Sequence, residues 1–184
     1  MPTIVARWQD WSGRGLEHLV LKEGSGQIVA AAAVLGVSGN QLFAAHYKIC
    51  CDPDWRVRSV ELHEIGSDRT LELASNGAGN WSDGSGATQP QLAGAMDVDI
   101  SITPFTNTLP IRRLGLKPGE SAEIAAVYVR LPELTAGTDL QRYTCLEPRR
   151  RYRYESLDSD FMREIETDEH GLVTLYPGLF RRIL

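Results

Sequence analysis

The sequence contains few cysteines, and their number is odd. Cys50, Cys51 and Cys145 are the only three in 184 residues, so they cannot all pair as in the disulfide framework of a small secreted protein. Cys50 and Cys51 are adjacent, and on a strand their side chains would point to opposite faces of the sheet. The cysteine content therefore predicts reduced thiols in a reducing compartment.

A surplus of positive charge is also missing. The formal net charge is -5, whereas nucleic-acid binding generally needs an excess of Lys and Arg. Residues 149–154, RRRYRY, are a local exception, because cations alternating with aromatic rings can bind single strands. On a strand, Arg149, Arg151 and Arg153 would share one face, and arginines also protect an exposed sheet edge. We interpret the run as the solvated face of an edge strand and expect no nucleic-acid partner.

No long apolar segment is present. The most apolar stretch, residues 28–37, reads IVAAAAVLGV and is too short to cross a bilayer as a helix. The first residues, MPTIVARWQDW, lack the basic start and apolar core of a secretory leader. We therefore expect a soluble, cytoplasmic protein with no transmembrane segment.

Sequence motifs of catalysis and metal binding are lacking as well. His18, His46, His63 and His170 do not stand at metal-ligand spacing, and Cys50-Cys51 lacks the two-residue spacer of a zinc or redox pair. The sequence contains no GxSxG, GxGxxG or P-loop string. We expect no metal ion, no cofactor and no catalytic residue, and we lean against an enzyme.

Turn-forming residues, in contrast, recur at short intervals from one end of the chain to the other, which leaves little room for long helices. The runs between them alternate with period two or are rich in strand formers, as in residues 56–61 and 123–129. Residues 161–167 and 172–176 are predicted to form a hairpin around 168–171, and residues 28–37 are read as a strand. The pattern predicts a mainly β protein with one domain over residues 1–184.

One segment departs from this pattern. Residues 103–114 read TPFTNTLPIRRL, where Thr103 suits a helix N-cap and Pro104 suits the first helical position. Pro110 should end or kink this helix, because proline is poorly tolerated in a helix interior. The preceding strand, residues 96–102, places Asp97 and Asp99 on one face and its apolar residues on the other. We predict one short helix, starting at Pro104.

The central string, residues 94–114, reads GAMDVDISITPFTNTLPIRRL and resembles the signature of the putative glycolipid-binding family, long catalogued as a domain of unknown function. Tyr47, Trp55 and Trp81, the 141–143 and 152–154 segments and the 171–179 segment fit the same pattern. Ala95 departs from it, standing where a cysteine is expected. The resemblance covers essentially the whole chain. It implies an all-β spiral β-roll, a many-stranded antiparallel sheet wrapped around a single short helix, and a homodimer.

The resemblance also implies a ligand, since the fold is similar to that of bacterial lipoprotein carriers, which hold acyl chains against a curved sheet. The candidate residues lie in and before the helix, where Asn107 and the arginine forks can grip head-group oxygens. The apolar side chains among them would hold the lipid tail. The set comprises Asp97, Asp99, Phe105, Thr106, Asn107, Leu109, Ile111, Arg112 and Arg113.

Each of these groups also has a purely structural interpretation. Asp97 and Asp99 can pair with Arg112 or Arg113 or cap the helix, and Asn107 can bond to the helix end. Two carboxylates about 6–7 Å apart on one strand can also serve as an acid–base pair. The four tryptophans suit either the core or a ligand pocket. They are Trp8, Trp11, Trp55 and Trp81.

The sequence leads us to expect a non-catalytic protein that binds a lipid or glycolipid within the curled sheet or at its mouth. Two alternatives stay open. The first is a hydrolase that acts on a glycosyl or acyl bond through Asp97 and Asp99. The second is an obligate dimeric scaffold in which the signature residues only build the roll.

Overall fold

A single curled β-sheet of 14 strands dominates the computed structural model, which describes residues 3–184. The strand order is β7-β6-β5-β4-β3-β2-β1-β14-β13-β12-β11-β10-β9-β8. Neighbouring strands are antiparallel, except that β8 and β9 are parallel. Strand β14 pairs with β1, so the two ends of the chain meet in the middle of the sheet.

The first seven strands follow one another as hairpins. Buried and exposed side chains alternate along these strands, as expected for a sheet with one face in the core. In β3, for example, the buried residues are Ile28, Ala30, Ala32 and Val34, and the residues between them are more exposed. Their bounds are β1 Thr3–Asp10, β2 Leu16–Glu23, β3 Ile28–Ser38, β4 Gln41–Cys51, β5 Val57–Glu64, β6 Thr70–Ser75 and β7 Trp81–Asp83.

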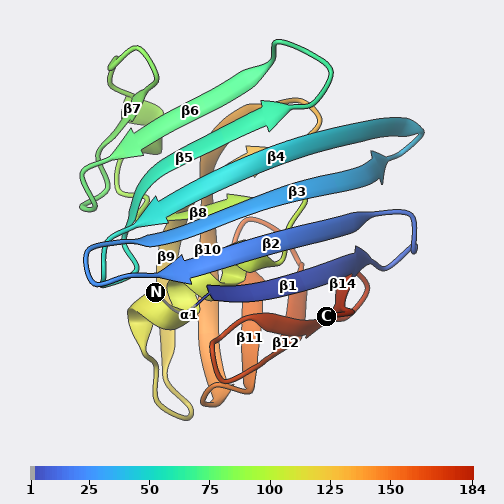
Figure 1. The fold of residues 1–184 in the computed structure, drawn as a ribbon. Helices are drawn as coiled ribbons and strands as arrows, with labels where there is room; N and C mark the ends of the chain where they lie inside the picture. The colour runs from blue at the N-terminus through green and yellow to red at the C-terminus, as the bar shows by residue number, and fades with distance from the viewer. Residues whose placement is uncertain (1–2) are drawn as a thin grey trace.

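The second half of the sheet contains the predicted strand over 123–129 and the predicted hairpin, both of which are confirmed. Its strands are β8 Asp97–Ile100, β9 Ser121–Arg130, β10 Thr135–Glu147, β11 Arg151–Ser156, β12 Met162–Thr167, β13 Val173–Tyr176 and β14 Phe180–Arg182. Figure 1 shows β1 to β6 as a front layer, with β9 to β11 passing behind it at a steep angle. The sheet thus curls back on itself, as the resemblance implied.

The helical segment lies between the two halves of the sheet (Figure 1). It consists of a 3-10 turn, Phe105–Asn107, followed by the helix α1, Thr108–Leu114; a second 3-10 turn covers Pro90–Leu92. Leu109 packs into the larger core cluster, which joins the front layer to β8 and β9, whereas Ile111 packs with Tyr143 and Tyr154 in the smaller cluster. One short helix therefore supplies apolar side chains to both core clusters.

Two expectations about local structure need correction. Pro110 does not end the helix, because the 3-10 turn delays α1 until Thr108 and leaves Pro110 in its first turn, where no amide donor is needed. The run 149–154 is not an edge strand, since β11 lies between β10 and β12. Its arginines instead pair across the sheet surface: Arg151 with Glu147 at 2.8 Å and Arg153 with Glu164 at 3.2 Å.

Candidate functional site

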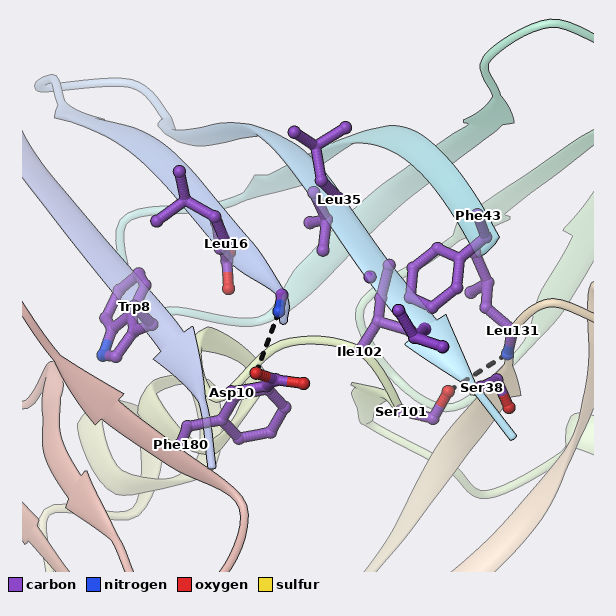
Figure 2. A pocket seen from close by; sticks show the side chains of 15 residues that line it. Trp8, Asp10, Leu16, Leu35, Ser38, Phe43, Ser101, Ile102, Leu131 and Phe180 are labelled. Carbon is purple, nitrogen blue, oxygen red and sulfur yellow. Dashed lines mark hydrogen bonds between the residues drawn. The ribbon is translucent and has the colours of Figure 1, made fainter. Parts of the chain in front are cut away.

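Two adjoining cavities lie between the curled halves of the sheet. The apolar lobe, about 250 Å³, is walled by Leu16, Leu35, Phe43, Ile102 and Leu131. Figure 2 shows side chains from both walls around this space, with Trp8 and Phe180 at one end. The residues come from β1 to β4, from β14 and from the segments that follow β8 and β9.

The second cavity, the polar lobe, has a volume of about 450 Å³. Three carboxylates, one arginine and several aromatic rings face it. Ser101 and Phe180 line both lobes, so the two cavities are neighbours, and we call the pair the cleft. The main polar-lobe residues are Asp99, Asn107, Tyr128, Arg130, Asp139, Tyr154, Asp158, Phe161 and Tyr176.

Glu17 is a buried carboxyl group in the lining of the apolar lobe. It follows the inner-face alternation of β2 with Leu19 and Leu21 and is only 3% exposed. Its Oε1 accepts hydrogen bonds from the Tyr47 hydroxyl at 2.5 Å and the Thr103 hydroxyl at 2.8 Å. Its Oε2 has no hydrogen-bond partner within residues 3–184. Burial raises the pKa of Glu17 to about 7, although both hydroxyl donors oppose the rise.

Asp99 is the corresponding carboxyl group in the polar lobe. Strand β8 positions it beside the Thr106 hydroxyl at 3.0 Å and the Gln141 amide at 2.8 Å. The same amide donates to Asp139 at 2.9 Å. Burial raises the pKa of Asp99 to about 6; its two donors lower it, and the nearby Asp139 charge adds to the rise. The cleft therefore holds two carboxyl groups that ionise only near neutral pH.

Asn107 also lines the polar lobe, and each end of its amide makes one hydrogen bond within the protein. Its Nδ2 donates to the Pro104 carbonyl at 3.2 Å, and its Oδ1 accepts from the Tyr143 hydroxyl at 3.0 Å. These contacts hold the amide rigidly at the cavity wall. Asp99 and Asn107 are the two predicted site residues that the structure brings to the cleft.

Asp97 lies elsewhere and forms a buried ion pair. The Arg113 guanidinium donates to its two oxygens at 3.0 and 2.5 Å, and Asp97 is 1% exposed. Burial raises the pKa of Asp97, and Arg113 opposes the rise. Asp97 lines neither lobe, so the geometry gives no support to hydrolysis by the Asp97–Asp99 pair.

Arg112 is also remote from the cleft. It donates to the His170 carbonyl at 2.9 Å and to Glu23 at 3.3 Å. Its guanidinium lies 4.4 Å from the centre of the Trp55 ring. The sequence predicted ion pairs between these aspartates and arginines; the Asp97–Arg113 pair forms, whereas Asp99 is held by a hydroxyl and an amide.

The remaining predicted residues are in the packed interior. Phe105 and Leu109 are fully buried in the larger core cluster, and Ile111 packs in the smaller one. Thr106 is 2% exposed and acts on the cleft through its hydrogen bond to Asp99. None of these four side chains lines either lobe.

Sequence reasoning missed Glu17, although a signal was available. In residues 16–23, LEHLVLKE, a period-two pattern aligns Glu17 with Leu19 and Leu21 on one face. A carboxyl group on an apolar face is unusual, because buried charges are rarely tolerated without partners. The long-range contacts from Tyr47 and Thr103 had no such signal, since they depend on how the sheet curls.

The described chain offers neither a metal-binding cluster nor a membrane-spanning helix. Residues 3–184 contain no cluster of His, Cys, Asp and Glu side chains that could hold a metal ion. In the same range, no helix is long and apolar enough to cross a membrane. The three cysteines are unpaired thiols, with Cys51 buried and Cys50 partly exposed.

Comparisons with known proteins agree with the observed fold. A crystal structure of a DUF1089 family protein from Pseudomonas aeruginosa is similar, with 37% sequence identity, a TM-score of 0.80 and coverage of 92% of each chain. No curated protein matches the sequence. The family model described as Putative glycolipid-binding matches residues 5–182, and the chain therefore belongs to this family.

Proposed function

We propose that the protein binds a glycolipid or a related amphiphile without catalysing a reaction. The observation that supports this proposal is that the two lobes are neighbours with Ser101 and Phe180 in common, so that one ligand could meet an apolar and a polar environment. The acyl chain occupies the space among Leu16, Leu35 and Phe43, and the head group faces the aromatic rings and carboxyl groups of the polar lobe.

The physical chemistry of each lobe supports this orientation. Burial of apolar area contributes roughly 25 cal/mol per Å², so a chain that loses ~200 Å² of exposed area gains about 5 kcal/mol. In the polar lobe, Tyr128, Tyr154 and Tyr176 offer rings on which a sugar can pack. Asp99 and Asp139 offer acceptors for sugar hydroxyls. The chain supplies affinity, and the polar lobe selects the head group.

This proposal revises the roles of the residues predicted from sequence. Asp99 and Asn107 contact the ligand in the polar lobe. The others position the walls: Arg113 neutralises Asp97, Thr106 orients Asp99, and the apolar residues of the helical segment join the two halves of the sheet. These supporting residues are Asp97, Phe105, Thr106, Leu109, Ile111, Arg112 and Arg113.

Lipid retention tests the proposal. The purified protein is incubated with a total lipid extract, separated from free lipid, and analysed by mass spectrometry for bound amphiphiles. Leu35→Asp places a charge in the wall of the apolar lobe at a side chain that is already 56% exposed, and it should abolish retention. Leu140→Asp, at a 46% exposed position outside both lobes, is the matched control and should retain lipid.

Two results would contradict the proposal. The first is a wild-type protein that carries no more amphiphile than an unrelated protein treated in the same way. The second is equal retention by Leu35→Asp and Leu140→Asp, which would place the lipid outside the apolar lobe.

A further inference from the structure

The hydrogen bond between Thr103 and Glu17 links the linings of the two lobes, and we call this contact the junction. Glu17 lines the apolar lobe, while Thr103, which donates to it, lines the polar lobe. Tyr47 and Thr103 both bond to Oε1, and this leaves Oε2 buried and without a partner in the described chain. An unpaired buried polar atom is unfavourable by about 1–3 kcal/mol, and a ligand group that bonds to it would recover this energy.

The charges around the cleft restrict what this group can be. The apolar lobe is lined by two carboxyl groups, Asp10 and Glu17, and its lining contains no Lys, Arg or His. The polar lobe is lined by one arginine, Arg130, and by three aspartates: Asp99, Asp139 and Asp158. An anionic head group would therefore enter a region of negative charge without a compensating cation at the junction.

Building on the proposed function, we propose that the cleft selects amphiphiles with an uncharged, hydroxyl-bearing head group and rejects anionic lipids and fatty acids. A ligand hydroxyl at the junction hydrogen-bonds to Oε2 of Glu17, with the apolar chain on one side and the rest of the head group on the other. Figure 2 shows the apolar side chains, Leu16, Phe43 and Ile102 among them, that line the space proposed for the chain.

A hydroxyl group is the chemistry that suits this carboxyl group in both of its protonation states. A hydroxyl donates to an ionised Oε2 and accepts from a protonated one. A carboxylate or sulfate ligand can only accept, so it loses this bond and meets repulsion whenever Glu17 is ionised. Glu17 thus discriminates by rejecting one class of ligand as well as by binding the other.

Calorimetric titration with two octyl amphiphiles below their micelle concentrations tests this inference. Octyl glucoside carries a neutral, hydroxyl-rich head, and octyl sulfate has the same chain with a permanent negative charge. At about pH 8, where Glu17 is mostly ionised, the wild-type protein should bind octyl glucoside at least about tenfold more tightly. Glu17→Gln removes the charge at nearly constant shape and should narrow this ratio to about threefold or less.

The matched control is Glu123→Gln, the same chemical change at a 63% exposed side chain outside both lobes; it should leave the ratio unaltered. Melting curves establish that each variant is folded. Should Glu17→Gln fail to fold, Glu17→Met is titrated instead, because Tyr47 and Thr103 lie 3.2 Å apart and can bond to each other.

Three outcomes overturn the inference. Equal affinity of the wild-type protein for the two probes, or a ratio unchanged by Glu17→Gln, contradicts selection by Glu17 while the proposed lipid binding stands. Failure of the wild-type protein to bind either probe, together with a lipid-free protein in the retention experiment, contradicts the proposed function and the inference with it.

Discussion

At the residue scale, loss of the Asp97–Arg113 ion pair should lower the free energy of unfolding more than loss of the other ion pair of the helix, Arg112–Glu23. Arg113→Ala would leave a carboxylate that is 1% exposed without its cation. Breaking a buried pair in this way typically destabilises a protein by about 3–5 kcal/mol, and we expect a loss of this size in chemical denaturation.

Arg112→Ala provides the internal comparison. The Arg112 and Glu23 side chains are 30% and 27% exposed, so solvent screens their pairing, and the Trp55 contact adds only about 1 kcal/mol. We expect a loss of about 1–2 kcal/mol. Equal losses in the two variants would contradict the difference in burial between the two pairs.

The raised pKa of Glu17 leads to a second prediction at this scale, on how the stability of the protein depends on pH. This pKa rises from 4.5 in the unfolded chain to about 7 in the folded protein. Between these values the unfolded chain has released the proton and the folded protein keeps it, so stability falls as pH rises through this window. The shift corresponds to about 3 kcal/mol. Asp99 acts in the same direction between 3.8 and about 6.

Denaturation curves of wild-type protein and Glu17→Gln at a series of pH values would measure this effect. The variant should lose about 3 kcal/mol less between pH ~4 and ~8, because glutamine has no proton to release. Parallel curves for the two proteins would show that Glu17 does not titrate in this range.

The same residues show how far sequence reasoning reaches. The alternation of residues 96–102 predicted that Asp97 and Asp99 share a face, and Asp97 does find one of the two arginines named as partners. Which arginine pairs with Asp97 depends on the rotation of the helix about its axis. The bond from Gln141 to Asp99 depends on a strand more than forty positions away in the sequence. Neither is encoded in local spacing.

At the element scale, the hairpin of β3 and β4 shapes the wall of the apolar lobe. Gly36 and Phe43 are paired across these strands, and the Phe43 ring lies over the glycine. A Cβ added at Gly36 would lie 2.3 Å from Cζ of the ring, so glycine leaves the space that the ring occupies.

Gly36→Ala should therefore displace the ring, lower stability by about 1–3 kcal/mol and weaken octyl glucoside binding. Gly137→Ala in β10 is the control, because a Cβ there meets no atom within 4 Å. Denaturation and calorimetry on both variants would check the expectation. An unchanged affinity for Gly36→Ala would remove Phe43 from the binding wall.

Local chemistry also accounts for what was and was not foreseen in the helical segment. The Thr103 hydroxyl accepts from the Phe105 amide at 3.0 Å, but the helical segment begins as a 3-10 turn at Phe105 with Pro104 at the N-cap, one residue later than predicted. The error at Pro110 arose because a 3-10 turn cannot be told from the first α-helical turn by residue type. Proline is acceptable at the start of either.

At the scale of the whole molecule, turn spacing and alternation were sufficient to predict a mainly β chain with one short helix. They could not place β14 beside β1, or β8 parallel to β9, because such pairings join distant segments and leave no periodic trace. The curl of the sheet came from the family resemblance. The cleft forms only because the sheet curls, so local sequence patterns did not identify Glu17 as a cleft residue.

The homodimer implied by the resemblance is the last expectation to test. The edge strands β7 and β8 have three and four residues, too few for a stable dimer to form by extending the sheet. Association should instead use an apolar surface beside the cleft, formed by Leu35, Leu42 and Ile65, which are 56%, 80% and 54% exposed.

Sedimentation equilibrium should then give a mass near twice the 20.4 kDa of the chain. Leu42→Asp should shift the protein to monomer with little effect on folding, because the side chain is largely exposed and a charged group on a dimer surface opposes association. Met162→Asp, at a 49% exposed side chain outside this surface, should leave the dimer intact. A wild-type monomer, or a Leu42→Asp dimer, would reject this surface. Since Leu35 also lines the apolar lobe, dimer formation there would partly cover the cleft, and lipid release should then be faster from the Leu42→Asp monomer.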